Sequence, residues 1–169
     1  MNAEQLKAAQ GPLKEKYKQD PAAARQTLRA VATLCPGEVA CKLDEAVLRP
    51  IAGLHPSAGG DGTRACSAEL LLGGLATCAG VTLQAVSTAL AIPITGGRVV
   101  AEGDMDFRGT LGVAREVPIG ITDVRLRFEL TGDITAEQQA TLLKLVERYC
   151  VVFQTLKSPP TCRAEMVKG

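Results

Sequence analysis

The chain has 169 residues, a formal net charge of +1 and only 3% aromatic residues. So small a charge gives no electrostatic attraction to DNA or to an anionic membrane surface, and so few aromatic side chains offer little stacking surface for single-stranded nucleic acid. The length suits one domain over residues 1–169, and the charged N-terminus lacks the apolar segment of a signal peptide. These features predict a cytoplasmic protein without a nucleic-acid partner.

The first third of the chain predicts a helix followed by antiparallel strands. Residues 3–18 have the pattern of an amphipathic helix that Gly11-Pro12 interrupts, and residues 1–22 are expected to be a helical extension of the domain. Three strands are expected next: residues 26–34, with Leu28, Ala30, Ala32 and Leu34 facing inward, residues 38–43 beyond a Cys35-Pro36-Gly37 turn, and residues 47–54.

The middle of the chain predicts a long buried helix over residues 67–91, with Ser67 as its N-cap. No charged residue lies between Leu70 and Gly97, and the helix is apolar on nearly all sides, which favours burial on nearly all sides. A membrane span is the alternative, but the glycines, the polar residues and Pro93 in this stretch argue against it. The sequence therefore predicts no membrane partner.

The last third of the chain predicts two strands, a helix and a short terminal strand. The two strands cover residues 98–107 and 123–130, and both alternate between apolar and charged side chains, as a sheet with one wet face does. A Thr135–Gln138 capping box begins the helix. Its apolar stripe is expected to comprise Leu142, Val146, Tyr149 and Phe153, and Cys162, Ala164 and Met166 suggest the last strand.

This order of elements predicts an α+β fold in which antiparallel sheets pack on a long central helix. A buried helix of about 35 Å is hard to enclose in a chain of this size. An obligate homodimer that shares its central helices would enclose it, and we expect one.

Two of the six cysteines, Cys78 in the central helix and Cys150 in the last helix, are candidates for chemistry. A buried free cysteine usually behaves as a small apolar side chain, so neither residue alone indicates a function. Their separation of 150 − 78 = 72 residues is neither a CxxC redox motif nor a zinc spacing. From spacing alone, the sequence does not predict that the two thiols meet.

Three segments together resemble the OsmC/Ohr family of osmotically inducible and organic hydroperoxide resistance proteins. Residues 69–86 (ELLLGGLATCAGVTLQAV) look like the family's central helix, and residues 145–156 (LVERYCVVFQTL) look like its second cysteine motif. Residues 100–112 (VAEGDMDFRGTLG) lie between them and are similar to the family's strand-and-turn segment. The resemblance extends from about Leu48 to the C-terminus.

The resemblance implies a peroxidase with two working cysteines. Cys78 would be the peroxidatic residue, which attacks an organic hydroperoxide and becomes a sulfenic acid. Cys150 would be the resolving residue, which forms a disulfide with it that an external dithiol then reduces. The family also implies an OsmC-like fold, an intertwined homodimer with both cysteines near the subunit interface, and neither a metal nor an organic cofactor.

A catalytic thiol needs a nearby cation or dipole that lowers its pKa. The family uses an Arg from the N-terminal strand region, held by a Glu just before the central helix, and Glu69 is the candidate for that Glu. Glu69 lies nine residues before Cys78, where the hydroperoxide-resistance branch has ten, and its alternative role is that of an acidic residue at a helix start. The matching turn has no Arg, which leaves Arg29, Arg49 and Arg64 as possible substitutes.

Several alternatives stay open. Cys66 at the start of the central helix is a possible second reactive thiol, whereas Cys35, Cys41 and Cys162 are expected to be structural. A zinc site from His55, Cys35, Cys41 and Cys66 lacks the close cysteine pairs of structural zinc.

Two alternative functions are a non-catalytic OsmC-like protein that binds a small ligand, and a general thiol-disulfide oxidoreductase. If the protein is a peroxidase, the apolar neighbours Leu75, Val81 and Leu83 favour bulky organic hydroperoxides over hydrogen peroxide.

Overall fold

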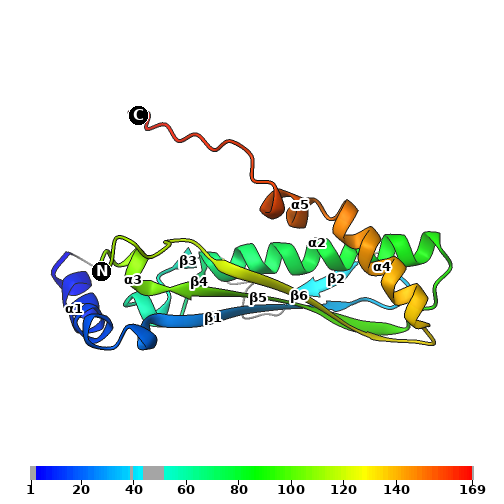
Figure 1. Ribbon diagram of the computed structural model, residues 1–169, viewed down its shortest axis with the longest axis horizontal. Coiled ribbons are helices and arrows are strands. Elements are labelled where there is room, and N and C mark those ends of the chain that lie inside the picture. Colours follow the sequence, from blue (N-terminus) through cyan, green and yellow to red (C-terminus); the bar gives the residue numbers. More distant parts are fainter. Residues whose placement is uncertain (1–2, 39, 44–51, 169) are drawn as a thin grey trace.

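The computed structural model describes residues 3–38, 40–43 and 52–168. Its elements are α1 (Ala3–Gln19), η1 (Pro21–Ala24), β1 (Arg25–Leu34), β2 (Cys41–Leu43), β3 (Ala52–Gly53), η2 (Pro56–Ala58), β4 (Ala65–Cys66), α2 (Ser67–Ala89), β5 (Gly96–Asp106), α3 (Phe107–Thr110), β6 (Thr122–Thr131), α4 (Ala136–Tyr149) and α5 (Val151–Lys157). The predicted α+β class is confirmed: one antiparallel sheet has the strand order β2-β1-β5-β6, and α2 runs along one of its faces (Figure 1).

The inner face of the sheet and the long helix α2 together form the main core. The four inward residues that alternation predicts on β1, from Leu28 to Leu34, are all buried there. Strands β1 and β5 pair over nine residues, with Ala30 opposite Ala101, so both strands present small side chains to the helix. Helix α4 crosses α2 and adds Leu142 and Val146 to the same cluster (Figure 1). The capping box at Thr135 is present as predicted.

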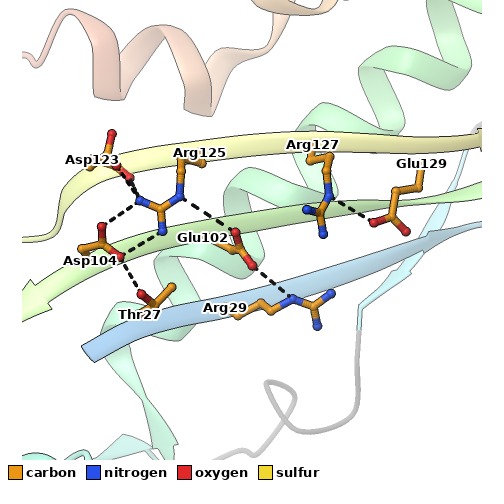
Figure 2. A network of polar contacts seen from close by, with 8 residues as sticks. All are labelled: Thr27, Arg29, Glu102, Asp104, Asp123, Arg125, Arg127 and Glu129. Carbon is orange, nitrogen blue, oxygen red and sulfur yellow. Dashed lines mark hydrogen bonds and ion pairs between the residues drawn. The ribbon is translucent and has the colours of Figure 1, made fainter. Parts of the chain in front are cut away.

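The outer face of the sheet carries a network of ion pairs, as the alternating pattern predicts (Figure 2). The Arg125 guanidinium lies 2.8 Å from an Asp104 carboxylate oxygen, and the Thr27 hydroxyl donates to the other oxygen at 2.7 Å. These contacts lower the pKa of Asp104 to about 2, mainly because Arg125 stabilises the carboxylate. The charged side chains on this face therefore contact one another and solvent, on the opposite side of the sheet from α2.

The N-terminal helix departs from its prediction because α1 runs without interruption through Pro12. A proline inside a helix removes one hydrogen bond. Packing on both sides of it offsets that loss: the Tyr17 hydroxyl donates to the Ser57 carbonyl and the Gln10 amide donates to the Ala58 carbonyl. The extension predicted over residues 1–22 thus contains a helix that packs against the turn before α2.

The central helix is less buried than its composition predicts. Leu71 and Val81 are 46% and 40% exposed, because the four-stranded sheet covers only one side of α2. The N-cap prediction is also wrong: Cys66 occupies that position, without a side-chain hydrogen bond, and Ser67 is the first helical residue. Ser67–Ala89 is long and apolar enough to cross a membrane by composition alone, but half of its most apolar window is buried within the protein, as in a core helix.

The C-terminal part differs most from its prediction. Helix α4 ends at Tyr149, whose side chain is 56% exposed and therefore does not continue the Leu142–Val146 stripe. A separate short helix, α5, follows Cys150. Residues 158–168 extend away from the domain without a strand, and Cys162, expected in a core, is exposed (Figure 1). Within one chain, the described segment has no sheet neighbour with which to form a strand.

The hairpin and the strand after it are shorter than predicted. The turn at Cys35-Pro36-Gly37 is present, but the returning strand β2 covers only Cys41–Leu43. The strand expected over residues 47–54 is represented by β3, which pairs in parallel with β4, and residues 44–51 lie outside the described residues.

Candidate active site

The structure brings Cys78 and Cys150 together from distant parts of the chain. Cys78 lies midway along α2, and Cys150 is the single residue between α4 and α5. Cys150 belongs to the main core cluster and Cys78 packs against it, close enough that Cys78 contributes to the raised pKa of the Cys150 thiol. Neither cysteine forms a disulfide in this structure. The arrangement is a dithiol poised beside an apolar core, and spacing in the sequence did not predict it.

The helix is interrupted at Cys150 because this residue leaves the helical conformation. Its φ of −69° and ψ of 110° are those of extended backbone, so Cys150 is the C-cap of α4 and the N-cap of α5. Its N–H still donates to the Val146 carbonyl at 2.9 Å, and its carbonyl accepts the first helical bond of α5, from Gln154, at 2.9 Å. The break turns α5 away from the axis of α4 (Figure 1).

The surroundings of the two thiols differ in a way that matters for chemistry. Cys150 is 0% exposed, whereas Cys78 is only half-buried. Burial raises the pKa of the Cys150 thiol, because the apolar core disfavours its thiolate. The neighbouring Cys78 raises this pKa further, and the backbone N–H groups of Phe153 and Val152 oppose the rise. Cys150 is therefore held as a neutral thiol, and Cys78 is the more accessible sulfur.

The raised pKa of Cys150 predicts alkaline destabilisation of the reduced protein. In the unfolded chain this thiol ionises first, so the folded state holds one proton more as the pH rises above about 9. The free energy of unfolding should then fall by about 1 kcal/mol per pH unit until the folded thiol also ionises. Urea titrations between pH 8 and 10.5 test this. Cys150→Ala should lose that extra slope relative to the wild type, and an unchanged slope would contradict the burial argument.

Glu69 does not contact Cys78 directly. It lies half-buried in the first turn of α2, about 13.5 Å along the helix axis from Cys78 and half a turn around it. Its charge instead acts on His55, where it opposes the lowering of the imidazole pKa by burial. A catalytic role for Glu69 would have to act through another residue, and it stays a prediction.

Two of the three possible substitutes for the activating Arg are engaged elsewhere. Arg29 points to the outer face of the sheet, where its guanidinium lies 3.5 Å from Glu102 (Figure 2). Arg64 is exposed and packs across Gly53, before the start of α2. Arg49 lies outside the described residues.

Cys66 and Cys35 do not join the pair. Cys66 is buried at the start of α2, and the turn that carries half-buried Cys35 contacts α2 beyond Cys78, where the Gln84 amide donates to the Cys35 carbonyl at 3.1 Å. Over residues 3–38, 40–43 and 52–168, no group of three or more His, Cys, Asp or Glu side chains is placed to hold a metal ion. His55 instead stacks on Phe107, with ring centroids 4.9 Å apart.

Sequence reasoning missed two polar residues around the thiols. The Thr82 hydroxyl donates to the Cys78 carbonyl at 2.8 Å, and the Gln154 side chain donates to the Glu147 carbonyl at 2.6 Å. A threonine four residues after a helical cysteine is a local signal that could have indicated the first contact. No local signal marks the second, because neither Gly nor Pro accompanies the break at Cys150.

The fold and the paired thiols define an α+β dithiol protein. The profile of OsmC-like proteins matches residues 60–165, which include both cysteines, and the chain belongs to this family. A crystal structure of an OsmC-like hydroperoxide resistance protein from Jannaschia sp. CCS1 has a similar fold, with a TM-score of 0.60 and 19% identity over 86% of this chain and 95% of that chain. No curated protein sequence matches the chain significantly.

Proposed function

We propose that this protein reduces organic hydroperoxides by a cycle in which Cys78 is oxidised and Cys150 resolves it. The observation that carries the proposal is that Cys78 and Cys150, 72 residues apart in sequence, pack together in one core cluster, where Cys78 contributes to the raised pKa of Cys150. Membership of the OsmC-like family, together with the hydroperoxide resistance in the name of the structural relative, supports a peroxidase-type role in general. The assignment of each cysteine rests on the difference in their exposure.

In the first step the Cys78 thiolate attacks the outer oxygen of the hydroperoxide. An S–O bond forms, the O–O bond breaks, and the alkoxide takes up a proton and leaves as the alcohol. Cys78 is then a sulfenic acid, oxidised by two electrons. The half-buried position of Cys78 leaves a route for the peroxide to its sulfur.

In the second step Cys150 condenses with the sulfenic acid. Its sulfur displaces the hydroxyl group, the thiol proton and that hydroxyl leave as water, and a Cys78–Cys150 disulfide forms. An external dithiol then supplies two electrons and becomes a disulfide itself. Because burial keeps the Cys150 thiol neutral, peroxide reacts slowly with it directly. Cys150 therefore stays reduced until Cys78 has become a sulfenic acid, as a resolving residue requires.

The apolar surroundings of Cys78 favour organic hydroperoxides over hydrogen peroxide. Leu75 is fully buried beside it in the core cluster, and Val81 lies on the neighbouring exposed stripe of α2. Burying an alkyl group against such side chains contributes about 0.8 kcal/mol per methylene, which hydrogen peroxide cannot gain. The catalytic efficiency should accordingly be higher with cumene hydroperoxide than with hydrogen peroxide, and equal efficiencies would exclude this preference.

A second candidate function is binding of a small apolar ligand without turnover. A cavity of about 440 Å³ between α2, β6 and α4 is lined mainly by Leu83, Leu126, Phe128 and Leu142, and neither Arg29 nor Arg64 contacts Cys78. Titration of free thiols after one equivalent of cumene hydroperoxide separates the two functions. A peroxidase loses two thiols per chain, and a binding protein loses none. A general thiol-disulfide oxidoreductase would in addition reduce insulin.

The exposed side of α2 supports the proposal that the protein works as a homodimer. Leu70, Leu71 and Val81 form an apolar surface beside Cys78, and Tyr149 and Val151 are exposed on either side of Cys150. A second copy would cover these side chains and shield the thiol pair from water. The proposed assembly is cytoplasmic and contacts neither membrane nor nucleic acid.

The dimer predicts a strong effect of a charge at Val81. Val81→Asp should convert the protein into a monomer at micromolar concentration by light scattering, because a buried unpaired carboxylate opposes association. Val124→Asp is a matched control, since Val124 on β6 is equally exposed, at 39% against 40%. A wild-type protein that is monomeric at this concentration would refute the dimer.

A further inference from the structure

The break at Cys150 leaves a carbonyl that a side chain has to satisfy. In a continuous helix the N–H of Val151 would donate to the carbonyl of Glu147, four residues before it. At the break, the side-chain amide of Gln154 donates to this carbonyl instead, at 2.6 Å. Gln154 thus replaces a backbone hydrogen bond that the turn at Cys150 removes.

Gln154 also holds the other side of the break. Its backbone N–H donates to the Cys150 carbonyl at 2.9 Å, so one residue is bonded to α4 through its side chain and to Cys150 through its backbone. These two bonds fix the angle between α4 and α5, and that angle sets the direction of the Cys150 side chain. Cys150 is the single residue between the two helices, so a change in the angle between them moves its side chain directly.

We propose that Gln154 is a positioning residue that holds the sulfur of Cys150 against that of Cys78 by bridging α4 and α5. The inference deepens the proposed function, in which Cys150 is the resolving residue. A disulfide forms only over a narrow range of geometry, with Cα atoms about 4.4–6.8 Å apart. Without the Gln154 bridge, α5 can rotate relative to α4, and Cys150 then also occupies positions too far from Cys78 for a disulfide. Disulfide formation then slows, and Cys78 sulfenic acid stays exposed to a second peroxide.

Two variants of Gln154 and one control test the role of the bridge. Gln154→Met keeps the length of the side chain and removes the donor, and Gln154→Lys keeps a donor at the same place. Gln139→Met is the matched control, since Gln139 makes the same kind of contact at the opposite end of α4, where its amide donates to the Ile134 carbonyl. Neither end of this control contact touches Cys150.

The first readout is the Cys78–Cys150 disulfide at equilibrium in glutathione redox buffer at pH 7, measured by peptide mapping. This equilibrium gives the effective concentration of the Cys150 thiol at Cys78. Gln154→Met should lower that effective concentration about fivefold, which corresponds to the net free energy of one ordinary hydrogen bond. Gln154→Lys should restore the wild-type value. Its added charge has little effect on this equilibrium, because the raised pKa of Cys150 keeps the thiol neutral at pH 7. Gln139→Met should match the wild type.

The second readout is over-oxidation of Cys78 to sulfinic acid under about ten equivalents of cumene hydroperoxide, at which a slow resolving step lets a second peroxide react. This over-oxidation should increase in Gln154→Met alone.

The inference is overturned if Gln154→Met stays within twofold of the wild type in glutathione, or if the Met and Lys variants lose the disulfide equally. The glutathione measurement needs no peroxide turnover. A wild type that shows the expected pattern there but consumes no hydroperoxide would therefore refute the proposed function and leave the positioning role intact.

Discussion

Cys78→Ser abolishes hydroperoxide consumption, with a loss of at least about a thousandfold in the rate of the first step. A serine hydroxyl does not ionise near neutral pH and cannot form the sulfenic acid on which the cycle depends. The substitution is nearly isosteric, and Cys78 is only half-buried, so the fold should be retained. The measurement is the disappearance of cumene hydroperoxide in the presence of excess dithiothreitol.

The matched control for this variant is Cys162→Ser, which changes an exposed thiol in the C-terminal segment. It should consume peroxide at the wild-type rate. Circular dichroism and thermal unfolding show whether each variant is folded. A folded Cys78→Ser protein with full activity would assign the nucleophile to another cysteine, with buried Cys66 at the start of α2 as the next candidate.

With peroxide and without an external thiol, Cys150→Ser permits one oxidation per chain and then stops. Cys78 still reacts with peroxide at close to its normal rate, but the sulfenic acid has no thiol within reach, so it persists. Dimedone should label Cys78 in this variant and not in the wild type. Excess peroxide should convert the trapped sulfenic acid into sulfinic acid, which dithiothreitol cannot reduce.

The Cys150→Ser result separates the resolving role from a purely structural one. Because Cys150 is fully buried, a polar serine there also lowers stability, by about 1–3 kcal/mol if its hydroxyl finds no partner. Cys150→Ala controls for this, since it removes the thiol without burying a hydroxyl. Both variants should trap the sulfenic acid equally. Continued turnover in both would mean that another thiol, such as the half-buried Cys35, resolves Cys78.

Local sequence patterns predicted the strands and helices around the site, because each pattern reflects interactions between residues close in sequence. The alternation from Leu28 to Leu34 corresponds to one buried and one wet face of β1, and side chains of β1, β5 and β6 form the polar network of Figure 2. The Thr135 capping box predicted the start of α4, since it satisfies backbone N–H groups within four residues. The uncharged stretch predicted one long helix, although its cap is Cys66 and not Ser67.

The candidate site depends on contacts that no local pattern encodes. The apposition of Cys78 and Cys150 arises from the crossing of α2 by α4, and the direction of the Cys150 thiol arises from a break that no Gly or Pro marks. Helical spacing also failed for Tyr149, which ends α4 and is exposed although it lies three residues after buried Val146. Resemblance to a family predicted the cysteine pair because relatives share the tertiary packing that spacing alone does not reveal.

The most direct test of the proposed cycle is the mass of the reduced protein after one equivalent of cumene hydroperoxide, followed by peptide mapping without reductant. The cycle predicts a loss of about 2 Da, for the two thiol hydrogens, and one cross-linked peptide that contains Cys78 and Cys150. An unchanged mass with Cys78 unmodified would contradict it. The chain would then combine the OsmC-like fold and a close pair of thiols with a function other than peroxide reduction.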